Sequence, residues 1–134
     1  MKTYKILIID DEEGIHVNLS GLLKLWGFEP LSAFNAYDGL AIALKEEPLI
    51  IILDIGMPEV NGEILLKMLK RIEQTNHIPV LILSGSLDKD ILTNTYREGA
   101  AKFISKPFLQ KILLRRITEC LDPDTLEEMN LSKY

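Results

Sequence analysis

Several side chains able to bind metals or take part in phosphoryl chemistry follow the apolar runs of this sequence. They are Asp10, Asp11, Asp54, Ser84 and Lys106. Carboxylate oxygens suit hard cations, and Mg²⁺ is commonly held by one or two carboxylates together with waters and phosphate oxygens. A lysine and a hydroxyl near such a cation suit a phosphoryl group, toward which an aspartate can act as nucleophile. The set indicates phosphoryl chemistry at Asp54, provided that the fold brings its members together.

The elements that would position these side chains follow from the apolar pattern. Five short runs rich in Ile, Leu and Val predict strands at residues 5–10, 28–33, 49–54, 79–84 and 102–105. Between them, apolar residues recur at helical spacing and predict helices with one buried face, as at Ile15, Leu19, Leu22, Leu23 and Trp26, or at Leu65, Met68, Leu69 and Ile72. Gly27 suits the end of the first helix and Asn61 the N-cap of the third. Later helices are expected at residues 36–46, 88–98 and 109–121.

Strict alternation of strands and helices predicts a parallel sheet with helices on both faces. In such sheets the ligand crevice lies beyond the carboxyl ends of the strands. The polar residues named above would therefore meet at one edge. Two unit charges about 4 Å apart repel by about 4 kcal/mol at an effective dielectric of about 20, so a cluster of acids at this edge favours a bound cation.

Length and composition exclude several classes of protein. The chain has 134 residues, about one domain, with 47% hydrophobic and 26% charged residues, as in an ordinary globular protein. A net charge of −5 argues against direct binding of nucleic acid. The N-terminus lacks a signal-peptide pattern and no apolar run is long enough to cross a bilayer, so we expect a cytoplasmic protein. The single cysteine, Cys120, is expected to be a small buried side chain.

Four segments carry a family resemblance. "IIDDEE", "ILDIGMP" with Gly62 eight residues after the acid, "LILSG" and "GAAKFISKPF" occur in this order between residues 3 and 121. Together they resemble the response-regulator receiver domain of two-component signal transduction. The resemblance implies an α/β, flavodoxin-like fold: a doubly wound, five-stranded parallel sheet of order 2-1-3-4-5 with five helices.

The resemblance also assigns the phosphorylation site. It makes Asp54 the phosphoacceptor, and it makes Asp10, Asp11 and Asp54, with the backbone carbonyl of Gly56, the ligands of Mg²⁺. Lys106 would pair with the phosphoryl oxygens. Asp54 could then end an apolar run because a cation and a lysine offset its charge, while Met57-Pro58 redirects the chain toward the third helix.

A conformational switch is implied as well. The Ser84 hydroxyl would move to the phosphoryl group while the Phe103 ring turns inward, which would change the surface of the fourth helix, fifth strand and fifth helix. The Lys106-Pro107 peptide bond is expected to be cis, a form largely confined to positions before proline. In the family, two positions influence the loss of the phosphoryl group. Here they are Gly56, which offers no side chain, and Ser86, so the lifetime of the phosphorylated state stays open. His16 and His77 are expected at the surface.

The leading hypothesis is a phosphorylation-controlled switch rather than a turnover enzyme. Its partners would be a sensor histidine kinase or phosphotransfer protein and an output domain or downstream protein. A homodimer through the surface of the fourth helix, fifth strand and fifth helix is a further hypothesis, since Leu114 and Leu121 look exposed beside Arg115, Arg116 and Glu119. Two other functions stay open: a receiver-like binding scaffold that is not phosphorylated, and an aspartyl-phosphate hydrolase of the haloacid dehalogenase type, although Gly56 stands where that class has a second acid.

The domain boundary is expected near Leu121. Residues 1–121 would form the receiver domain, and residues 122–134, which open with Asp122 and Pro123 and turn acidic, would be a linker, a short extra helix or a ragged end. A stand-alone regulator and a piece of a longer protein both fit the sequence.

Overall fold

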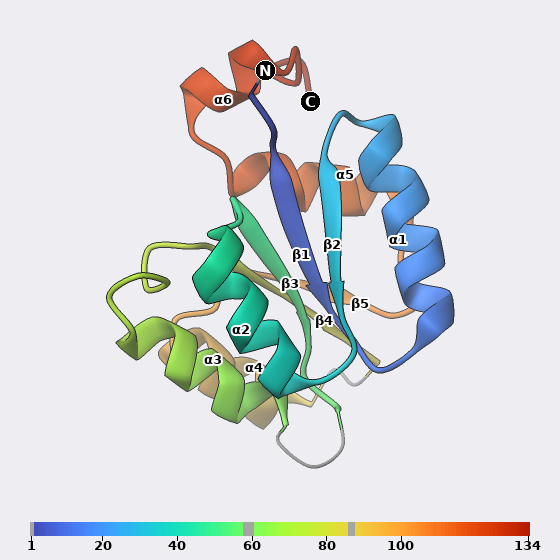
Figure 1. The fold of residues 1–134 in the computed structure, drawn as a ribbon. Helices are drawn as coiled ribbons and strands as arrows, with labels where there is room; N and C mark the ends of the chain where they lie inside the picture. Colours follow the sequence, from blue (N-terminus) through green and yellow to red (C-terminus); the bar gives the residue numbers. More distant parts are fainter. Residues whose placement is uncertain (1, 58–60, 86–87) are drawn as a thin grey trace.

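Strands and helices alternate along the chain, as the apolar pattern predicts. The computed structural model describes residues 2–57, 61–85 and 88–134. Its strands are β1 (Lys5–Ile9), β2 (Glu29–Ala33), β3 (Ile50–Asp54), β4 (Val80–Ser84) and β5 (Lys102–Ser105). Its helices are α1 (Glu13–Leu25), α2 (Ala36–Glu46), α3 (Gly62–Arg71), α4 (Lys89–Arg97), α5 (Gln110–Glu119) and α6 (Pro123–Glu128). Figure 1 shows the sheet at the centre with helices on either side.

All strand pairs in the sheet are parallel, and the strand order is β2-β1-β3-β4-β5. This confirms the expected doubly wound fold. The register aligns Ile9 with Ala33 on one side and Leu53 on the other. Asp54 lies opposite Leu83 of β4, one residue before Ser84. The strands therefore end together at one edge of the sheet.

Each face of the sheet has its own hydrophobic core. On one face, alternate strand residues pack against α2 and α3, with α4 at the side; this core includes Leu7, Ile9, Ile51, Leu53, Leu65, Leu66 and Leu69. The opposite face packs against α1 and α5 and includes Ile6, Ile8, Ile50, Ile52, Leu19, Leu23, Leu113 and Ile117. The central strand β3 is buried along its whole length, as expected for a parallel strand covered on both sides.

Two predicted helix boundaries are confirmed. The Asn61 side chain caps α3 by accepting a hydrogen bond from the Ile64 N–H at 3.0 Å. Gly27, just past α1, has a φ of +94°, a left-handed value that favours glycine.

The sequence allowed three interpretations of residues 122–134: a linker, a short helix or a ragged end. The structure shows the short helix α6. Its N-cap is Asp122, which accepts a hydrogen bond from the Thr125 N–H at 2.8 Å. Beyond α6, Leu131 is 5% exposed and belongs to the core that contains α1 and α5. Glu128 accepts hydrogen bonds from Lys2 at 2.9 Å and from the Tyr4 hydroxyl at 2.7 Å. The segment thus covers the end of the sheet opposite the carboxyl ends of the strands (Figure 1).

Several expectations about exposure were wrong. His16 is buried, at 4% exposure, because α1 turns its ring toward β2, whereas His77 is exposed as expected. Leu114 is buried on α5, at 7% exposure, and Leu121, also expected to be exposed, is half-buried against the core that contains α1 and α5. Met68, taken as part of the buried face of α3, is 40% exposed, because that helix buries Leu66 instead. Within the described ranges, none of the helices is long and apolar enough to span a bilayer.

Candidate functional site

Four of the predicted site residues meet at the carboxyl edge of the sheet. The Lys106 ammonium lies 2.9 Å from Asp10 Oδ2 and 3.6 Å from Asp54 Oδ2. It also lies 3.5 Å from Glu12 Oε1. Asp10 and Asp54 are buried, at 1% and 6% exposure, while Asp11 beside them is exposed. The strand ends thus bring the acids and the lysine together as the sequence predicts.

Asp54 is the last residue of β3. Its Oδ1 atom accepts a hydrogen bond from the Gly56 N–H at 3.0 Å, which orients the carboxylate. Burial, and to a smaller extent the charge of Asp10, raises the pKa of the Asp54 carboxyl. The Gly56 hydrogen bond and the charge of Lys106 lower this pKa, but the net value lies above the ordinary one. A cation at this edge would favour the ionised form, which is the nucleophilic one.

Lys106 follows β5 and is fixed through its backbone. Its N–H donates to the Ser84 carbonyl at 2.8 Å, and the Lys106-Pro107 peptide bond is cis, which confirms that expectation. Burial lowers the pKa of the Lys106 ammonium. The contact with Asp10 and the charges of Asp54 and Glu12 raise this pKa by more than burial lowers it, so it lies above its ordinary value. The lysine therefore stays protonated, able to offset negative charge.

The acids after β1 have the donor set of a Mg²⁺ site. Asp10, Asp11 and Glu12 each offer a carboxylate oxygen, and these atoms lie within 4.8 Å of one another. The Oδ2 atom of Asp10 is buried and faces the Lys106 ammonium at 2.9 Å. Carboxylate oxygens gathered this closely favour a bound cation, so these residues fit a hard ion such as Mg²⁺.

The two residues expected to switch lie on the neighbouring strands β4 and β5. Ser84 ends β4 and is 5% exposed. Phe103 of β5 is half-buried, and its ring centroid lies 4.7 Å from that of Tyr96 on α4. Tyr96 itself is 52% exposed. The aromatic pair thus connects β5 with the α4 surface.

Some predicted positions lie outside the described residues, and two contributors were not predicted. Pro58 and Ser86 belong to the first group. Glu12 pairs with Lys106, but the sequence does not show whether Glu12 or Glu13 would do so, because residues 10–13 are all acidic. His16 contacts the Asp10 carbonyl through its Nε2 atom at 2.7 Å.

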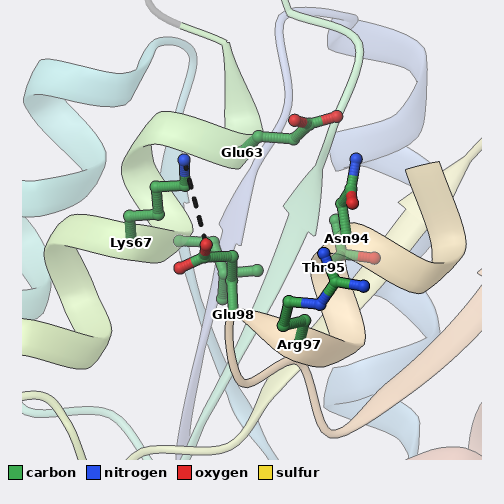
Figure 2. Close-up of a pocket in the computed structure, with 7 residues that line it drawn as sticks. Glu63, Lys67, Asn94, Thr95, Arg97 and Glu98 are labelled. Carbon is green, nitrogen blue, oxygen red and sulfur yellow. Dashed lines mark ion pairs between the residues drawn. The ribbon is translucent and has the colours of Figure 1, made fainter. Parts of the chain in front are cut away.

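A cavity lies between α3 and α4 and is not lined by Asp10, Asp11 or Asp54. It has a volume of about 260 Å³ and is lined by charged and amide side chains, among them Glu63, Asn94 and Arg97. Figure 2 shows the ion pair between Lys67 and Glu98 that crosses it, at 3.8 Å. None of the predicted site residues lines this cavity, so the candidate site is the carboxylate edge.

This chain is similar to proteins of a known family. The family model for the response regulator receiver domain matches residues 6–118. The protein PilH of Pseudomonas aeruginosa is 32% identical over 117 residues, covering 87% of this chain and 97% of PilH. Sporulation initiation phosphotransferase F of Bacillus subtilis is 32% identical over 108 residues, covering 81% of this chain and 86% of that protein.

A longer relative and a solved structure also match this chain. The phosphate regulon regulator PhoB of Pseudomonas aeruginosa is 34% identical over 116 residues, which cover 87% of this chain but only 51% of PhoB. The chain thus spans about half the length of that relative. The chemotaxis protein CheY4 of Vibrio cholerae superposes with a TM-score of 0.85 at 28% identity, over 90% of this chain and 100% of CheY4. With the matched fold and the strand-end acids, the family match shows that this chain belongs to the response-regulator receiver domains of two-component signalling.

Proposed function

We propose that Asp54 accepts a phosphoryl group from a phosphohistidine on a partner kinase or phosphotransfer protein. The observation that carries this is the contact of the buried Asp54 carboxylate with the Lys106 ammonium at 3.6 Å, beside the acids after β1. A carboxylate oxygen of Asp54 attacks phosphorus, the P–N bond breaks, and the departing imidazole nitrogen keeps the electron pair and takes a proton. Lys106 offsets charge on the phosphoryl oxygens.

The return step regenerates the carboxylate. Water attacks the phosphorus of the acyl phosphate, inorganic phosphate leaves, and Asp54 is restored. This slow autodephosphorylation is the protein's own catalysis, without turnover of an external substrate. Bound Mg²⁺, held by Asp10, Asp11, Asp54 and the Gly56 carbonyl, would stabilise negative charge on the phosphoryl group.

Phosphorylation at Asp54 changes the surface of α4, β5 and α5. Ser84 turns toward the phosphoryl group, and Phe103 moves away from Tyr96 into the space that Ser84 leaves. An apolar groove of about 420 Å³ at this surface supports the proposal, since it is lined by Phe103, Phe108 and Ile112 among others. Leu109 at its rim is 64% exposed. An output domain or a downstream protein binds there, and a second copy of the chain is the alternative partner.

Intact mass after incubation with acetyl phosphate tests the phosphoacceptor. We expect the gain of one phosphoryl group with Mg²⁺, and no gain with EDTA or in Asp54→Asn. Asp124→Asn, an exposed acid on α6, is the matched control and should be phosphorylated like the wild type. Phosphorylation of Asp54→Asn would refute the assignment, and failure of the wild type with both acetyl phosphate and cognate kinases would favour the binding scaffold.

A second measurement tests the switch. In Lys106→Ala, phosphorylation at Asp54 should no longer shift the amide resonances of α4, because the lysine couples the phosphoryl group to β5. Shifts on α4 that survive in this variant would contradict the role of Lys106.

A further inference from the structure

A buried histidine on α1 holds the end of β1. His16 is 4% exposed, and its Nε2 atom lies 2.7 Å from the carbonyl oxygen of Asp10. Its Nδ1 atom lies 2.9 Å from the Ser32 hydroxyl on β2. The ring also stacks on Phe34, with centroids 4.1 Å apart and an interplanar angle of 32°. One imidazole therefore connects α1, β2 and the residue that begins the acidic cluster.

The carbonyl partner fixes the hydrogen on the ring. A carbonyl oxygen can only accept, so Nε2 must carry the hydrogen that is donated to Asp10. In the neutral ring Nδ1 is then an acceptor, and the Ser32 hydroxyl donates to it. Both ring nitrogens have a partner, and His16 has a defined tautomer and orientation.

The peptide and carboxylate of Asp10 are held from several sides. The Asp10 N–H donates to the Ala33 carbonyl at 3.1 Å, and the carbonyl accepts from His16. The Oδ1 atom accepts from the Glu12 N–H at 2.9 Å. These contacts leave Oδ2 facing Lys106, in the direction of the other acids. Among them, the His16 contact is the one made by a side chain of a neighbouring element.

We propose that His16 is a positioning residue for Mg²⁺ binding: its Nε2–H orients the Asp10 peptide so that the carboxylate points into the acidic cluster. The proposal rests on the function proposed above, because it needs Asp10 to be a metal ligand. Hydrogen bonds that orient metal ligands contribute to affinity without touching the metal, since the ligand loses less freedom when the cation binds.

Two substitutions separate this role from simple packing. His16→Gln removes the ring but can keep an N–H donor near the position of Nε2. His16→Phe keeps an aromatic ring against Phe34 but loses both hydrogen bonds. A packing role predicts that the Phe variant resembles the wild type, whereas a positioning role predicts that the Gln variant does.

The Mg²⁺ dissociation constant, measured by titration calorimetry and by the amide shifts of residues 10–13, is the main readout. Loss of one orienting hydrogen bond should raise the dissociation constant about tenfold in His16→Phe, with His16→Gln within about threefold of wild type. At Mg²⁺ concentrations that saturate each variant, the phosphorylation rate with acetyl phosphate should return close to that of wild type. Equal weakening in both variants, or none in His16→Phe, would overturn the proposal.

A measurement on the unsubstituted protein keeps the test independent of folding defects. The imidazole ¹⁵N shifts of metal-free wild type should show a hydrogen on Nε2, the atom that faces the Asp10 carbonyl. The reverse tautomer would overturn the positioning role whatever the variants do. Wild type that binds no Mg²⁺ would instead refute the metal site of the proposed function, and this outcome is recognised before any variant is compared.

Discussion

The Lys106 ammonium contacts the buried Oδ2 atom of the Asp10 carboxylate at 2.9 Å. The lysine side chain is 16% exposed and that of Asp10 is 1% exposed, so water screens the pair poorly. The lysine thus stabilises the acidic cluster in the absence of metal.

Removal of this lysine should make folding depend on the cation. In EDTA, Lys106→Met should lower the free energy of unfolding by about 2 kcal/mol, less than for a fully buried pair. Added Mg²⁺ should restore more stability in this variant than it adds to wild type, because the acids then repel without a counter-charge. Urea unfolding with and without Mg²⁺ measures both effects. Lys111→Met, at an exposed position of α5, is the control, and an equal response to Mg²⁺ in all three proteins would contradict the argument.

Gly62 is required because α3 begins directly against the end of β3. A Cβ at this position would lie 2.5 Å from the Asp54 carbonyl oxygen and 2.6 Å from the Ile55 Cα, both backbone atoms. Gly62→Ala should therefore force α3 away from β3 and reduce the free energy of unfolding by about 2–3 kcal/mol. Denaturant unfolding gives this value, and amide shifts around Asp54 report the displacement.

Gly21 is the matched control for that substitution. It lies on the exposed side of α1, and a Cβ there would meet no atom within 4 Å. Gly21→Ala should stabilise the protein by about 0.5–1 kcal/mol, because alanine is the better helix former. If both substitutions changed stability in the same direction, the close approach at Gly62 would not be the cause.

The segment after α6 contributes to the core, and Leu131 is the residue that tests it. This side chain is 5% exposed and packs with the α1 and α5 core. Leu131→Ala should lower the free energy of unfolding by about 2–4 kcal/mol. Leu25→Ala, at 76% exposure, should change it by less than about 0.5 kcal/mol. A neutral Leu131→Ala would mean that the segment is not packed in solution.

Cys120 should react slowly with alkylating reagents. Burial raises the pKa of its thiol to about 11, and the thiolate is the reactive form. The thiolate population, and with it the alkylation rate at pH 8, should be roughly 100-fold lower than in the urea-unfolded chain, since the ordinary value is 9.0. The native rate should still rise with pH between 8 and 10. The mass of the iodoacetamide adduct follows the reaction at this single cysteine, and a plateau near pH 9 would contradict the raised pKa.

The sheet and the convergence of the acids could be predicted because they depend on pattern and topology. Parallel strands end at one edge, so a polar residue directly after each apolar run is placed without knowledge of side-chain packing. Asp54 and Lys106 meet for that reason, although Asp54 ends β3, Lys106 follows β5, and β4 lies between these strands. The helix cap at Asn61 and the turn at Gly27 are likewise local signals.

Features that depend on tertiary contacts could not be predicted. His16 was expected at the surface because no neighbour in sequence explains its burial; its partners are a backbone carbonyl and Ser32, sixteen residues away. Apolar residues of a helix also have no fixed exposure until its tilt is known. On α3 that tilt exposes Met68, and on α5 it buries Leu114.

Both ends of the described chain lie beside each other at the end of the sheet away from the carboxyl ends of its strands (Figure 1), where Lys2 pairs with Glu128 of α6 at 2.9 Å. A fluorescent protein, an affinity tag or a surface tether attached at either end would therefore leave the acidic edge open to a bulky partner. Immobilised protein should thus be suitable for measuring kinase docking, and the same geometry makes a joined-end circular permutant a practical design.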